Sequence, residues 1–120
     1  MRTLKSFREL IVWKKSMDLA VQVYRMTETF PKSEIFGLAS QMRRAAVSVP
    51  SNIAEGQSRN SRGEFLQFLG IARGSLAELN TQTELSGRLG FLKKEEQKTL
   101  TNLIEEISKM LSGLKRSLPL

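Results

Sequence analysis

Four side chains in the segment SVPSNIAEG, residues 48–56, carry groups that could take part in catalysis: Ser48, Ser51, Asn52 and Glu55. A serine nucleophile needs an adjacent base and a third group that orients the base. The chain has no histidine and no cysteine, so a lysine or a carboxylate would have to be the base, and no lysine lies near these serines in sequence. A single carboxylate near a helix end is more often a cap partner or half of an ion pair. The pattern therefore does not support a catalytic site.

Pro50 gives the same segment a structural interpretation. Proline lacks an N–H group and its ring crowds the preceding turn, so it bends a helix that continues past it. The hydroxyl of Ser48 or Ser51 can satisfy the backbone groups that the bend frees. Asn52, if buried, can bind a neighbouring backbone group, and Gly56 can end the helix. We interpret this segment as having a structural role, and we expect a protein that is not an enzyme.

Other kinds of site also lack their residues. Without histidine and cysteine, a zinc or transition-metal site would need carboxylates alone, and the acidic residues form no such cluster in sequence. The glycines of GIARGS, residues 70–75, lie inside a helical pattern and not in the strand–loop–helix context of a phosphate-binding loop. We expect no metal, no cofactor and no small-molecule substrate.

Helical periodicity predicts the elements that must position these residues. The helices are expected at about residues 6–29, 35–55, 62–88 and 93–114. Pro31 blocks continuation of the first helix, and Ser33 is the expected N-cap of the second. Ser61 and Glu64 form a capping-box pattern before the third helix, and Gly90 follows its end. Short connections make sequential helices antiparallel. The prediction is all-α: a single domain, residues 1–120, folded as an antiparallel up-and-down four-helix bundle whose second helix is kinked at Pro50.

The first predicted helix carries two apolar stripes on roughly opposite sides, although a helix of a monomeric bundle needs only one. One stripe consists of Leu10, Trp13, Met17, Ala20, Val21 and Tyr24, and the other of Val12, Leu19, Val23 and Met26. We assign the first stripe to the core. We assign the second to an interface between copies of the chain, because an exposed apolar patch usually marks an interaction site.

The third predicted helix has a face of small residues behind its core stripe. This face consists of Gly70, Gly74 and Ala77, followed by Thr81. Each mid-helix glycine costs about 1 kcal/mol relative to alanine, and small side chains allow another backbone to approach closely. Packing of a loop or helix of the same chain is the alternative explanation. Together with the second stripe of the first helix, this face predicts a homo-oligomer.

The chain is basic, with a net charge of +7. Such a balance favours polyanionic partners, and arginine forms bidentate pairs with phosphate oxygens. The candidate phosphate contacts are Arg43, Arg44, Arg59, Arg62 and Arg73, with Lys14 and Lys15 second. Salt bridges between subunits, to Glu55, Glu64 or Glu78, are the alternative use of these cations. Phe65 and Phe68 belong to the core stripe, so we expect contact with nucleic-acid backbone and shape rather than stacking on bases.

No apolar run approaches the roughly 20 residues that a membrane-spanning helix needs. The N-terminal residues, MRTLKSFRELIVWKKS, also lack the uninterrupted apolar core of a signal peptide. We expect a cytoplasmic protein with no membrane partner.

Three long stretches resemble a known family. They are FRELIVWKKSMDLAVQVY (residues 7–24), LASQMRRAAVSVPSNIAEGQSR (38–59) and FLGIARGSLAELNTQTELSGRLGFL (68–92), with the specific pattern Q-x-x-R-A-x-x-S-x-P-x-N-I-A-E-G from Gln41 to Gly56. The chain resembles the four-helix bundle proteins encoded in intervening sequences of 23S ribosomal RNA genes. The resemblance implies antiparallel bundles that assemble into ring-like pentamers. It supplies no catalytic motif.

A related bundle is the accessory protein of diversity-generating retroelements, in which a basic pentamer binds RNA and a reverse transcriptase. Two functions follow as hypotheses. The first is a homo-oligomer that binds RNA or another nucleic acid by phosphate contacts. The second is a structural adaptor that docks a protein partner and has no nucleic-acid binding of its own. A steep loss of RNA affinity with salt would favour the first, because phosphate contacts release counterions.

Overall fold

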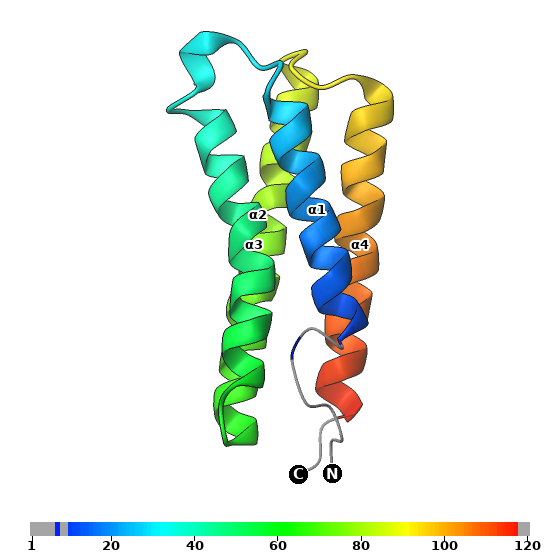
Figure 1. The fold of residues 1–120 in the computed structure, drawn as a ribbon. Coiled ribbons are helices and arrows are strands. Elements are labelled where there is room, and N and C mark those ends of the chain that lie inside the picture. The colour runs from blue at the N-terminus through cyan, green and yellow to red at the C-terminus, as the bar shows by residue number, and fades with distance from the viewer. Residues whose placement is uncertain (1–6, 8–9, 118–120) are drawn as a thin grey trace.

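The computed structural model describes Phe7 and residues 10–117. The described elements are α1 (Ile11–Thr27), the short 3-10 helix η2 (Lys32–Glu34), α2 (Leu38–Gln57), α3 (Arg62–Arg88) and α4 (Lys94–Ser117). Figure 1 shows the four long helices side by side, with consecutive helices antiparallel. α1 and α3 each pack against both α2 and α4. The part of the chain described here has no strand, and the predicted all-α four-helix bundle is confirmed.

Apart from the start of the first helix, each end of the four long helices lies within three residues of the predicted one. The start of the first helix is the exception: residue 6 itself lies outside the described residues, but the start predicted there is wrong, because Leu10 is extended and α1 begins at Ile11. α3 has both of its predicted end signals. The Ser61 hydroxyl accepts a hydrogen bond from the Glu64 N–H at 3.1 Å. At the other end Gly90 adopts a φ of 79°, while the N–H of Phe91 donates to the Ser86 carbonyl at 2.9 Å. These are the bonds of a glycine C-cap.

The predicted N-cap of the second helix is wrong. Ser33 lies within η2, and α2 begins only at Leu38. The carboxylate of Glu34 accepts from the Leu38 N–H at 3.1 Å and so satisfies one of the free donors of the first turn. A tight 3-10 turn directly after Pro31 places Glu34, and not Ser33, at the start of α2.

Pro50 lies inside α2, and the helix continues past it to Gln57. The predicted role of Asn52 is confirmed, since its side-chain N–H group donates to the Ser48 carbonyl at 2.8 Å and to the Ser48 hydroxyl at 2.9 Å. The same hydroxyl accepts from Ser75 of α3 at 2.8 Å. The Ser48 hydroxyl thus joins α2 to α3. Gly56 lies within the last turn, where a Cβ would stand 2.9 Å from Phe65 of α3, so it permits close helix packing.

The interface predicted on α1 is wrong, and the core predicted on the other stripe is confirmed only for Leu10 and Ala20, which are buried. Val12 is 5% exposed and Leu19 and Val23 are 0% exposed, so they belong to the core of the chain itself. Met26 is half-buried and packs against that core. On the opposite stripe Met17 is 41% exposed, and Val21 and Tyr24 are each 44% exposed. Val12, Leu19 and Val23 are therefore not available to a second copy.

The buried side of α1 also carries two hydroxyl residues. Ser16 and Thr27 lie on the same side of α1 as Leu19 and are 0% and 4% exposed. Each hydroxyl donates to the carbonyl four residues earlier, on Val12 and Val23 respectively, at 2.7 Å. Because the helix backbone satisfies them locally, these polar residues can be buried. This side of α1 is therefore the buried one although it carries two polar residues.

Candidate nucleic-acid interface

Arg43 contacts α1. Its Nε donates to the Thr27 hydroxyl at 2.8 Å, and its Nη2 donates to the Tyr24 carbonyl at 3.3 Å. The guanidinium carbon also lies 4.7 Å from the centre of the Tyr24 ring. The last carbonyls of α1 have no partner within the helix, and a positive charge there is favourable. Arg43 therefore closes the C-terminal end of α1 and is not a free guanidinium, and the phosphate contact predicted for it stays untested.

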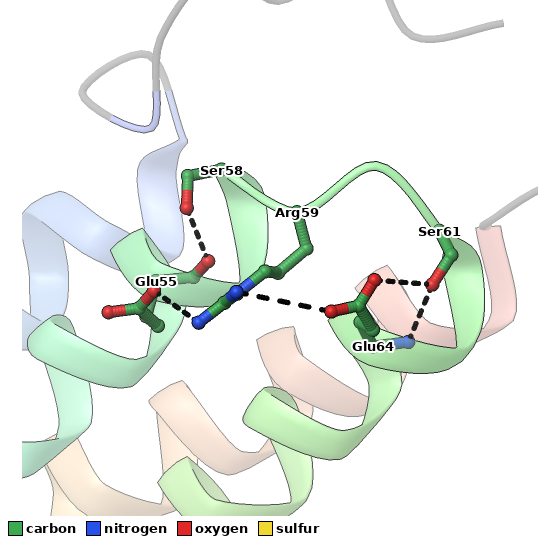
Figure 2. A network of polar contacts seen from close by, with 5 residues as sticks. All are labelled: Glu55, Ser58, Arg59, Ser61 and Glu64. Carbon is green, nitrogen blue, oxygen red and sulfur yellow. Dashed lines mark hydrogen bonds and ion pairs between the residues drawn. The ribbon is translucent and has the colours of Figure 1, made fainter.

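Arg59 lies in a polar network that joins the end of α2 to the start of α3 (Figure 2). Its Nη2 lies 2.8 Å from Glu55 Oε2, and its Nη1 lies 4.0 Å from Glu64 Oε2. Its guanidinium carbon is 5.0 Å from the centre of the Phe68 ring. The alternative predicted for this arginine was a salt bridge between subunits, whereas the pairs with Glu55 and Glu64 form within one chain. Two carboxylates offset this charge, so Arg59 is a poor phosphate contact.

Of the two predicted lysines of α1, one forms an ion pair and the other does not. Lys15 Nζ lies 3.5 Å from Glu106 Oε2 of α4, and both side chains are partly exposed. Lys14 is exposed, and no described residue forms an ion pair with it. Surface ion pairs contribute little stability, so the Lys15 contact mainly sets where that charge lies.

Three of the five arginines predicted as phosphate contacts form no ion pair with a described residue. Arg44 of α2 and Arg62 and Arg73 of α3 are exposed. Arg44 lines a hollow of about 350 Å³ between α2 and α3, together with Gln41, Ala45, Ser48, Ser75 and Glu78. The adjacent residues Arg43 and Arg44 thus point to different sides of α2. The structure does not gather the seven predicted cations into one patch.

Two of the open apolar surfaces bear on the predicted interface between copies. A Cβ built on Gly70 or Gly74 would have no neighbour within 4 Å, and Ala77 is exposed. The small-residue face of α3 is therefore not used by packing within the chain. The second surface is a hollow of about 310 Å³ between α1 and α2, lined by Trp13, Met17, Ala20, Val47, Pro50, Ser51 and Ala54. Of the α1 residues in this lining, all predicted to belong to the core, Ala20 is buried, Trp13 is half-buried and Met17 is exposed. Val47 was not predicted to contribute.

The described residues contain no group of three or more acidic, histidine or cysteine side chains placed to hold a metal ion. Within the same part of the chain, no helix is long and apolar enough to cross a membrane. The features of the described surface that bear on binding are therefore its exposed cations and its open apolar surfaces.

The fold and these surfaces define a small helical bundle with an uneven basic surface. The chain belongs to the family described as 23S rRNA-intervening sequence protein, which matches residues 8–113. The predicted family is thereby confirmed.

The structure is similar to the crystal structure, at 1.70 Å resolution, of a protein of unknown function from the S23 ribosomal protein family of Bacteroides thetaiotaomicron VPI-5482. The two share 26% identity with a TM-score of 0.80, and the match covers 89% of this chain and 100% of the other. No curated protein matches the chain.

Proposed function

We propose that this protein is a cytoplasmic, non-enzymatic, homo-oligomeric bundle that binds RNA or another nucleic acid through phosphate contacts. The observation that carries the proposal is that four of the seven predicted phosphate contacts are exposed and form no ion pair with a described residue: Arg44, Arg62, Arg73 and Lys14. Cationic side chains that are not neutralised within the chain are available to phosphate oxygens. The net charge of +7 also attracts a polyanion at longer range.

The two open apolar surfaces support an oligomer. They lie on different elements, one on α3 and one between α1 and α2. Contact between unlike surfaces of neighbouring copies repeats around an axis and closes into a ring when the rotation permits. The resemblance to ring-like pentamers is consistent with such contact. In place of the buried Val12, Leu19 and Val23, the proposed α1–α2 contacts include Met17 and Val47.

A protein adaptor is the second candidate, because large apolar side chains are also exposed at one end of the bundle. Phe36, in the connection between α1 and α2, is 96% exposed, and the adjacent Ile35 is 53% exposed. Exposed apolar groups of this kind suit a protein partner. On this hypothesis the positive charge has no role in binding.

The test combines a mass measurement in solution with RNA titrations at low and at physiological salt. A ring whose RNA affinity falls steeply as salt rises supports the proposal, because each phosphate contact releases counterions. A ring that binds no RNA at either salt favours the adaptor. A monomer contradicts the oligomer and the proposed roles of Gly70, Gly74 and Ala77.

A further inference from the structure

Three exposed cations near the C-terminal end of α4 were not among the predicted phosphate contacts. They are Lys109, Lys115 and Arg116. None of them forms an ion pair with a described residue. Cations in the last turn of a helix also favour the helix dipole, which is their purely structural explanation. These residues also lie near cations of α3, which gives them a second explanation.

The contact between Gly87 and Gln97 sets the register of α3 and α4. The Gln97 side chain lies directly over Gly87, at the end of the bundle where the two helices are connected. At about 100° per residue, Lys115 lies on the same side of α4 as Gln97, about five turns further along. Arg73 lies 14 residues before Gly87, within about 40° of it around α3. Because the helices are antiparallel, Arg73 and Lys115 meet at the same seam, roughly one turn apart along the axis.

Further cations extend this seam to both sides. Lys109 and Arg116 lie on the outward side of α4, and Arg62 lies in the first turn of α3, at the same end of the bundle (Figure 1). We name the five residues the α3–α4 basic strip: Arg62, Arg73, Lys109, Lys115 and Arg116. All five are exposed.

Few carboxylates oppose this charge. Glu105 lies on the outward side of α4, one turn before Lys109. Glu106 is turned toward Lys15 of α1, and Glu64 toward Ser61 and Arg59. Among the described residues, the strip therefore carries five positive charges with the carboxylate of Glu105 beside them. At the other end of the bundle, Lys93, Lys94 and Lys98 are interspersed with Glu95 and Glu96.

We propose that the α3–α4 basic strip is the surface on which this protein receives the phosphate backbone of duplex RNA. The inference rests on the proposed RNA binding and assigns it to particular residues. The large exposed aromatic side chains of the described chain, Tyr24 and Phe36, lie on α1 and in the α1–α2 connection, away from the strip. The strip thus offers charge without a stacking platform, which suits backbone contact. A duplex presents about twice the phosphate density of one strand along its axis.

The test compares two triple variants that remove the same charge. One is Arg73→Ala/Lys115→Ala/Arg116→Ala, in the strip, and the control is Lys93→Ala/Lys94→Ala/Lys98→Ala, at the other end. Affinity for an RNA duplex of about 20 base pairs and mixed sequence, and for one of its strands, is measured from low to physiological salt. The mass and helical content of each variant are measured on the same samples.

For the strip variant we expect a loss of duplex affinity of about tenfold or more at physiological salt. The slope of its affinity against salt should fall by about 0.9 for each phosphate that the variant no longer neutralises. The control should stay within about twofold of the wild type, and the wild type should prefer the duplex. A structural role at the end of α4 would change helical content without changing the salt slope.

Three results would overturn the inference. If the wild type binds RNA and the control loses as much affinity as the strip variant, the contact is not at the strip. If the wild type prefers the single strand, the partner is not a duplex. If the wild type binds neither RNA, the proposed function fails together with the inference.

Discussion

Replacing Arg43 with alanine is expected to lower the free energy of unfolding by about 2 kcal/mol and to leave RNA affinity per folded protein unchanged. A hydrogen bond that involves a charged group contributes about 1.5–3 kcal/mol, and the Arg43 bond to the Thr27 hydroxyl is 2.8 Å long. The contact with the exposed face of Tyr24 adds about 0.5–1 kcal/mol. Because Arg43 is only half-buried, the lower part of this range applies.

Arg44 is the matched control, since it is the same residue type at the next position and has no ion pair with any described residue. Arg44→Ala should change the free energy of unfolding by no more than about 0.5 kcal/mol. Urea denaturation followed by circular dichroism measures both values, at equal protomer concentration because oligomers are stabilised by mass action. Equal effects of the two substitutions would refute the assigned role of Arg43. A loss of RNA affinity in fully folded Arg43→Ala would refute it as well.

Three other substitutions test single contacts. Ser61→Ala removes the N-cap of α3 and should cost about 1 kcal/mol in urea denaturation, while no cost would mean that the cap bond is not formed in solution. Gly56→Ala places a Cβ 2.9 Å from Phe65 and should cost about 1–3 kcal/mol, and a more stable variant would contradict this close packing. A Cβ at Gly74 has no neighbour within 4 Å, so in Gly74→Leu the bundle should fold while its mass in solution falls. An unchanged mass would remove this face from the proposed interface.

Local interactions explain which features of the fold were predictable. Pro31 ends α1 because of its own covalent structure, and the Ser61–Glu64 cap joins residues three positions apart. Gly90 ends α3 because a positive φ is accessible to glycine. The start of α2 was missed by a few residues. At that point the sequence allows either a serine N-cap or a 3-10 turn, and residue spacing does not show which of the two forms.

The candidate site was less predictable, because the availability of a charge depends on distant residues. Arg43 and Thr27 are 16 positions apart, and Lys15 meets Glu106 only because α1 and α4 are neighbours. The α3–α4 basic strip likewise combines residues from two helices whose register is set by a contact between Gly87 and Gln97.

The sequence by itself determined the four helices, their antiparallel order and the family. These follow from periodicity, end signals and motif, which act over a few residues. Only the tertiary structure decided which stripe of α1 is buried, because both stripes have helical spacing and their neighbours choose between them. It also decided which cations are neutralised. Whether a cation is paired within the chain or free to bind a partner depends on the helix packed beside it. Packing brings together residues that are far apart in the sequence.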